Sequence, residues 1–171
     1  MTHRIRRGAV LAALASLAAV PALAADPVPD SRYAGETTQA NGLRFEFRVS
    51  EDGTHVERLL TQFRTPRCDR ADNGTQGSIR VRSLAIDGGS ISKRGKEKAR
   101  LAPSGSFKGG TQIERYRLAG IFSTPETAVG TLKVTVEVRN KAGVTIDNCK
   151  MGKRVTWAAD RLGVLPEIDG D

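Results

Sequence analysis

Apolar and polar side chains alternate over much of the chain, most clearly in residues 111–139. In the second half of this stretch, small or apolar residues occupy every second position: Ala128, Gly130, Leu132, Val134, Val136 and Val138. The first half has the matching pattern at Tyr116, Leu118, Gly120 and Phe122. A period of two buries one face of a pleated strand and leaves the other in water. Because Ser123-Thr124-Pro125-Glu126 between the halves has the composition of a turn, the sequence predicts a long β-hairpin.

Shorter segments with the same period flank this hairpin. Residues 33–37 are a candidate first strand, and an Asn41-Gly42 turn precedes an alternating run with apolar residues at Leu43, Phe45, Phe47 and Val49. Residues 79–86 predict another strand, whose apolar phase slips at Ser83 as in a β-bulge. Two further strands are expected in residues 144–149 and 153–159.

Three segments are harder to interpret. Apolar residues in 54–64 have helical spacing, but the segment follows a strand and an Asp-Gly turn, so we favour a strand with a bulge near Glu57-Arg58. Residues 68–77 are polar and predict a loop. Residues 90–110 are the least hydrophobic part and predict short strands separated by turns around Gly95 and Gly105.

These patterns predict an all-β fold: an antiparallel meander of about eight to ten strands without a long helix. A meander avoids exposed edges by closing into a barrel or by folding into two sheets. Glycines at Gly120 and Gly130, inside the two longest strands, permit strong coiling. We therefore expect a closed or partly open barrel, with a two-sheet β-sandwich as the alternative.

The first residues have the features of an export signal. Arg4, Arg6 and Arg7 precede an apolar run too short to span a bilayer, and Ala22-Leu23-Ala24 is a small-x-small cleavage site. We expect a signal peptide over residues 1–24, cleaved after Ala24, with a short membrane anchor as the alternative. The expected organisation is then an extended leader (25–31), one β domain (32–160) and an acidic tail (161–171), without a transmembrane segment after cleavage. The product would be secreted or periplasmic.

Cysteine content and charge bear on compartment and partners. Cys68 and Cys149 are the two cysteines of the chain, and in an oxidising compartment a pair most simply forms a disulfide. Residues 1–24 contain three arginines and no acid, so the remaining chain has 24 basic and 19 acidic residues and a net charge of +5. This mild excess does not predict a nucleic-acid-binding protein.

A basic run is the strongest candidate for a binding site. Residues 93–108 contain six cationic side chains and only Glu97 as an acid: Lys93, Arg94, Lys96, Lys98, Arg100 and Lys108. Such a hairpin could attract phosphates, lipid head groups or an anionic cell-envelope polymer. Its alternative role is edge protection, because lysines on an edge strand discourage sheet-to-sheet aggregation.

Other chemistry finds little support in the sequence. After cleavage, His55 is the single histidine, and no G-x-S-x-G motif is present. Asp69, Asp72 and Asn73 lack the alternating ligands of a calcium loop, and two carboxylate pairs, Glu36 with Glu46 and Glu114 with Glu126, lie among basic residues. We therefore expect no enzyme activity, no metal and no cofactor. The expected function is an exported binding or structural module; the alternatives are a barrel that holds a small apolar ligand and a secreted inhibitor.

Several short motifs resemble those of small secreted bacterial β-domains of unassigned function. They are Tyr33-x-Gly35-x-Thr37, Cys68, Gly120-x-Phe122, Ala128-x-Gly130, Cys149 and Trp157-x-Ala159, spread over residues 31–161. The resemblance implies a barrel or sandwich with one disulfide, and it implies no catalytic residues. A more distant similarity to lipocalin or avidin-like barrels lies in the strand rhythm, although the opening lacks the glycine-x-tryptophan signature of lipocalins.

Overall fold

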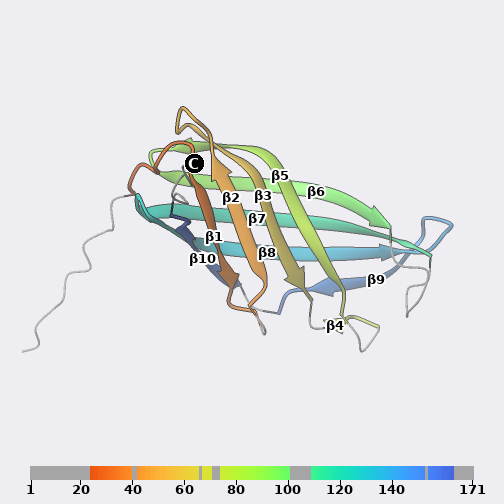
Figure 1. The fold of residues 1–171 in the computed structure, drawn as a ribbon. Helices are drawn as coiled ribbons and strands as arrows, with labels where there is room; N and C mark the ends of the chain where they lie inside the picture. The colour runs from red at the N-terminus through yellow and green to blue at the C-terminus, as the bar shows by residue number, and fades with distance from the viewer. Residues whose placement is uncertain are drawn as a thin grey trace, which may run out of the picture.

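The computed structural model describes residues 24–39, 42–65, 67–70, 74–100, 109–152 and 154–163. Within them the protein is all-β and antiparallel, as predicted (Figure 1). Its ten strands are β1 Arg32–Thr37, β2 Arg44–Val49, β3 His55–Arg64, β4 Arg67–Cys68, β5 Gln76–Asp87, β6 Ser90–Arg100, β7 Thr111–Thr124, β8 Thr127–Arg139, β9 Thr145–Lys150 and β10 Val155–Arg161.

Eight of these strands close into a barrel. β10 pairs with β1 on one side and with the first half of β8 on the other, which joins the two ends of the series β1-β2-β3-β5-β6-β7-β8. The barrel is loosest between β5 and β6, whose backbones pair only at Ile86↔Ile91 and Asp87↔Ser90. A barrel is therefore confirmed over the two-sheet sandwich, in the partly open form.

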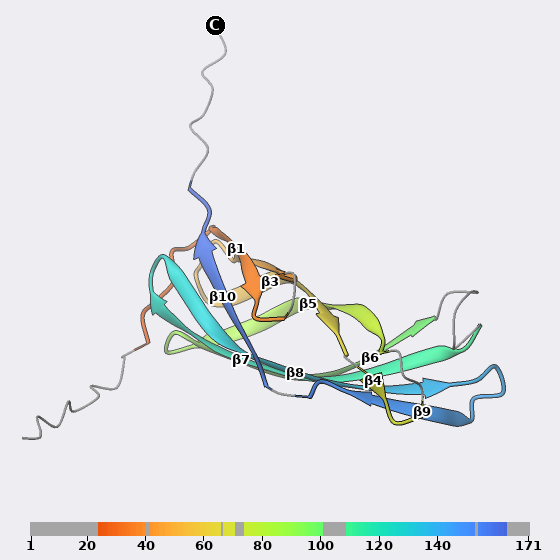
Figure 2. The same cartoon turned by 90° about the horizontal axis from the view of Figure 1, so that it is seen from below.

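The two remaining strands extend the sheet beyond the barrel. The second half of β8 pairs with β9, and β9 pairs with the short strand β4. Figure 2 shows the long strands β6, β7 and β8 running past the barrel with β9 beside them. Cys68 and Cys149 lie directly opposite each other in the β4–β9 pair and form a disulfide, which confirms the predicted bond.

This disulfide is consistent with an extracellular or periplasmic location. In the described part of the chain, no helix has the length and apolar character that a membrane crossing requires. Residues 1–23 of the expected signal peptide, and residues 164–171 of the expected tail, lie outside the described residues.

Aromatic rings fill the interior where the barrel closes. The Phe45 and Trp157 rings stack with centroids 4.1 Å apart, and the Tyr33 and Phe47 rings stack at 4.9 Å. Phe122 meets both Tyr33 and Phe47 edge-on. All five side chains are buried, as their positions in the alternating runs predict.

The mid-strand glycines make room for these rings. Gly120 and Gly130 are directly opposite each other in the β7–β8 ladder, and a Cβ atom on either one would collide with the indole of Trp157. From the sequence, we expected these glycines to permit strong coiling of the strands. The structure adds a second role, because the Trp157 indole packs closely on the backbone at both glycines.

The ambiguous segment 54–64 is a strand with a bulge, as favoured. Between Glu46 and Arg48 of β2 the ladder to β3 gains one residue, and Arg58 of β3 has a φ of 50°. The bulge predicted at Ser83 is not present in β5, because β5 pairs with β3 in unbroken register there. The slip in the apolar phase of β5 instead follows the bulge in β3.

Two expected irregular segments are more regular than predicted. Residues 90–100 form the single strand β6, and Gly95 is inside it rather than in a turn. The reason is packing: Gly95 is directly opposite Tyr116, and the tyrosine ring occupies the space where a Cβ would be. Residues 68–77 are not all loop either, since Cys68 ends β4 and Gln76 begins β5. Gly105 lies outside the described residues.

The leader contains no strand but is held against the barrel. The Ala25 amide donates to the Phe122 carbonyl at 2.8 Å, and the Asp30 amide donates to the Ser50 carbonyl at 3.0 Å. The Tyr33 hydroxyl accepts from the Val28 amide at 3.2 Å and donates to the Pro125 carbonyl at 2.5 Å. One buried tyrosine thus joins the leader to the β7–β8 turn.

Candidate anion-binding face

The basic run divides between the two sides of β6. Arg94, Lys96, Lys98 and Arg100 occupy alternate positions on the outer side, and all four are exposed. Lys93 has the opposite phase and shares the inner side with Ile91, where the loose β5–β6 junction leaves it exposed. Lys108 lies outside the described residues. The strand period therefore groups four of the six predicted residues and separates Lys93 from them.

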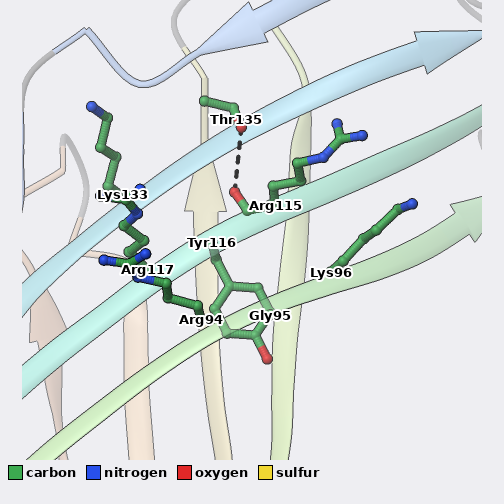
Figure 3. Close-up of a pocket in the computed structure, with 8 residues that line it drawn as sticks. All are labelled: Arg94, Gly95, Lys96, Arg115, Tyr116, Arg117, Lys133 and Thr135. Atoms are coloured by element: carbon green, nitrogen blue, oxygen red, sulfur yellow. Dashed lines mark hydrogen bonds between the residues drawn. The ribbon is translucent and has the colours of Figure 1, made fainter.

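Neighbouring strands add cations that the sequence interpretation did not include. Arg117 of β7 is directly opposite Arg94 on one side and Lys133 of β8 on the other. In the next row, Arg115 lies between Lys96 and Thr135. We call the five exposed cations of these two rows, with Thr135, the cationic face: Arg94, Lys96, Arg115, Arg117, Lys133 and Thr135 (Figure 3).

These residues surround a shallow hollow of about 660 Å³ on the outer side of the sheet, to which Gly95 and Tyr116 also contribute. Figure 3 shows Arg94 and Lys96 rising from β6, Arg115 and Arg117 from β7, and Lys133 from β8. The Thr135 hydroxyl donates to the Arg115 carbonyl at 3.5 Å. The alternation within each strand marked Arg115, Arg117 and Lys133 as outward-facing, but only the register between strands places them beside β6.

One cation of the face is compensated by an acid. Arg115 Nη1 lies 3.0 Å from Glu137 Oε2, and Arg139 Nη2 lies 2.8 Å from Glu137 Oε1. Glu137 Oε1 also accepts a 2.6 Å hydrogen bond from the Thr145 hydroxyl. The Thr145 bond, followed by those from Arg115 and Arg139, lowers the Glu137 pKa to about 2. Glu137 therefore stays ionised and holds Arg115 in place.

The other four cations have no acidic partner among the described residues: Arg94, Lys96, Arg117 and Lys133. Like charges directly opposite each other across strands are destabilising. The row Arg94–Arg117–Lys133 places three such charges side by side, so a bound anion would relieve a repulsion that the folded protein does not relieve internally.

Edge protection accounts for only part of this arrangement. From Ser92 onward, no strand of the described residues pairs with the β5 side of β6, so its lysines lie along an edge of the sheet. Arg117, however, belongs to β7, which is paired with β6 on one side and with β8 on the other. Lys133 lies on β8 in the short gap between the ladder to β10, which ends at Leu132, and the ladder to β9, which begins at Thr135. Since β7 has no open edge at Arg117, edge protection does not account for that residue.

The two carboxylate pairs considered for catalysis differ in the structure. Glu36 and Glu46 are diagonal neighbours in the β1–β2 ladder, with Arg44 directly opposite Glu36. Glu46 pairs with Arg44, and Glu126 forms an ion pair with Arg161 at 2.5 Å. Glu114 is buried inside the sheet, twelve residues along the chain from Glu126. Among the described residues no group of three or more histidines, cysteines or acids could hold a metal ion; Asp72 and Asn73 lie outside that range.

The sequence interpretation placed Glu114 among basic residues and missed its burial, which the structure shows. Its side chain is 1% exposed, and Oε1 accepts a 2.5 Å hydrogen bond from the Gln112 amide. Glu114 Oε2 and Gln112 Oε1 have no hydrogen-bond partner in the described part of the chain. Burial, and to a lesser extent the charge of Glu97, raises the Glu114 pKa to about 7. The one signal in the sequence is Ile113, which is out of phase with Tyr116 and Leu118. In the structure the three adjacent positions 112–114 are all buried.

Comparison with known proteins does not assign this face a function. No family model matches the sequence, and no curated protein and no solved structure is significantly similar to it.

Proposed function

We propose that the protein is an exported, non-enzymatic module that binds an anionic partner through the cationic face. The observation that carries this proposal is the row Arg94–Arg117–Lys133, in which three exposed cations lie side by side without a carboxylate between them. The export part is supported by the signal-like residues 1–24 and by the Cys68–Cys149 disulfide.

The chemistry of the face favours phosphate or a similar oxyanion. A guanidinium presents several donors in a planar fork that matches two oxygens of a phosphate or carboxylate, and Arg94 and Arg117 are adjacent. The Lys133 ammonium adds a third positive charge on the far side of Arg117. Because the face is exposed, these contacts are screened by salt.

The decisive variant replaces all three residues of the row, as Arg94→Gln/Arg117→Gln/Lys133→Gln. We expect it to bind a phosphate-bearing matrix about 10- to 150-fold more weakly, given exposed charge contacts of about 0.5–1 kcal/mol each. The measurement is the salt concentration at which the protein elutes from phosphocellulose, with calorimetric titration of a soluble polyphosphate as a second readout.

The matched control removes the same charge elsewhere, as Arg32→Gln/Arg64→Gln/Arg82→Gln, three exposed arginines on β1, β3 and β5. If both triple variants elute at the same salt concentration, retention reflects net charge only and the proposal is wrong. Wild-type protein that is not retained at low salt would also contradict it.

A further inference from the structure

The outer side of the β7–β8 hairpin changes chemistry along its length. On β7, Arg115 and Arg117 are followed at the same phase by Ala119 and Ile121. On β8, which runs the other way, Val129 and Thr131 are followed by Lys133. The antiparallel register places Ile121 opposite Val129 and Arg117 opposite Lys133. Apolar residues of the two strands are therefore neighbours at one end, and cationic residues are neighbours at the other.

The apolar end of this surface is a groove that continues over two more strands. Val129 is directly opposite Ala158 of β10, and Ala158 is opposite Glu36 of β1. We call this surface the apolar groove; its volume is about 690 Å³, and its outward-facing lining is Glu36, Thr38, Ala119, Ile121, Val129, Thr131, Thr156 and Ala158.

Small side chains explain the hollow. Ala119 and Ala158 are exposed and short, and Ile121 and Val129 are only partly exposed. Beneath them, on the inner side of the same wall, the Trp157 indole lies against Gly120 and Gly130. The groove is thus a shallow apolar surface supported from inside by a tightly packed ring.

The groove and the cationic face adjoin. The Ala119–Thr131 row is two residues from the Arg117–Lys133 row, about 7 Å along a strand. The only acid in the described lining of the groove is Glu36, which lies on β1, at the opposite end of the four-strand row from β7. A ligand across the junction would therefore meet three cations at one end and an apolar floor at the other.

We propose that the anionic partner is an amphiphile: a lipid with a phosphate head group on Arg94, Arg117 and Lys133 and a hydrocarbon chain in the apolar groove. This inference rests on the proposed function, because it uses the same cationic face. Charge complementarity fixes the head-group end, and the continuity of the two surfaces on β7 and β8 fixes where the chain lies. An inorganic phosphate or an anionic polymer would use the cationic face and leave the groove unused.

The test is a chain-length series of alkyl phosphates, from butyl to dodecyl phosphate, titrated calorimetrically below their aggregation concentrations. Each methylene that enters the groove should strengthen binding by about two- to four-fold. Inorganic phosphate is the arm without a chain, and a neutral dodecyl glycoside is the arm without an anionic head. Both should bind much more weakly than dodecyl phosphate.

One double variant, which replaces two apolar side chains of the groove by threonine, isolates the groove. Ile121→Thr/Val129→Thr should flatten the chain-length dependence and leave phosphocellulose retention unchanged. Val144→Thr is the matched control, since Val144 is 59% exposed in the β8–β9 turn and far from the groove in the register. If the double variant does not fold, the series on wild-type protein decides alone.

The outcomes separate the two proposals. Equal affinity for inorganic, butyl and dodecyl phosphate would overturn the amphiphile while leaving the anion-binding function standing. A neutral glycoside that binds as tightly as dodecyl phosphate would overturn the role of the head group. If neither phosphate nor the anionic matrix binds, the proposed function fails and the amphiphile fails with it.

Discussion

At the scale of single residues, Glu114 combines burial with an incomplete set of hydrogen bonds. The groups placed around it are Gln112 on its own strand, Glu97 directly opposite on β6, and Gly77 of β5 with the Phe63 ring of β3. None of them is a cation, and Glu97 carries the same sign of charge. Ionising Glu114 therefore costs free energy in the folded protein that it does not cost in the unfolded chain.

Because ionisation of Glu114 costs free energy only in the folded protein, the stability of the protein should depend on pH. The folded pKa, about 7, lies above the ordinary glutamate pKa of 4.5, so between these values the folded state holds a proton that the unfolded state has lost. The free energy of unfolding should then fall as pH rises through this window, by up to about 3 kcal/mol for this group. Urea unfolding at pH 5 and pH 8 measures it.

Glu114→Gln keeps the shape of the side chain and removes its charge. The variant should lose most of the difference between the two pH values and should gain stability relative to wild type at pH 8. Glu126→Gln, at an exposed turn position, is the control and should keep the wild-type dependence. An unchanged pH dependence in Glu114→Gln would mean that the carboxyl ionises freely inside the sheet.

At the scale of elements, the β7–β8 hairpin packs closely against Trp157 of β10 because Gly120 and Gly130 have no side chains. Ala at Gly130 would collide with the Trp157 ring and with the Ala119 carbonyl, and the backbone cannot move far because both edges of β8 are paired. We expect Gly130→Ala to destabilise the protein by about 1–3 kcal/mol, as overpacking does. Urea unfolding followed by the fluorescence of the single tryptophan reports it directly.

Gly152→Ala is the matched control, because a Cβ there has nothing within 4 Å and the backbone is not left-handed. It should be neutral or slightly stabilising. A Gly130→Ala variant as stable as Gly152→Ala would show that the indole has room to shift.

At the scale of the whole molecule, the disulfide closes a loop that includes four of the eight barrel strands. Cys68 and Cys149 are 81 residues apart, and β5, β6, β7 and β8 lie between them. On the chain-entropy estimate, a loop of this length stabilises by about 4–5 kcal/mol, chiefly by restricting the unfolded chain. This stabilisation comes from the length of the closed loop and is therefore independent of the contacts made by β4, which is only two residues long.

Cys68→Ala/Cys149→Ala should therefore lower the urea midpoint strongly while leaving the far-ultraviolet circular dichroism of the folded protein almost unchanged. Reducing the wild-type protein should reproduce the shift. The two substitutions also remove buried sulfur atoms, which by itself lowers the urea midpoint somewhat. If the midpoint falls only by that amount, the unfolded chain is already compact without the bond.

The sequence predicts single strands of this structure better than it predicts the contacts between strands. The strands of the central hairpin, and those at Phe45–Val49 and Ile79–Ile86, follow from alternation, because a half-buried strand needs nothing but its own period. Gly95 was misinterpreted because its role depends on Tyr116, which is 21 residues away in sequence and opposite it in space. The slip at Ser83 was misplaced for the same reason, since it follows the bulge of the neighbouring strand.

The candidate site shows the same division. The sequence by itself determined which side chains of β7 and β8 face outward, and it determined a cysteine pair suited to an oxidising compartment, because both are properties of local order and composition. It did not determine the outward side of β6, where it predicted a turn at Gly95. Only the tertiary structure decided that Arg94, Arg117 and Lys133 form one row and that an apolar groove adjoins it. The physical reason is register: the period within a single strand fixes the side on which each residue lies, whereas the residue directly opposite it on another strand depends on turn geometry and on packing across the barrel.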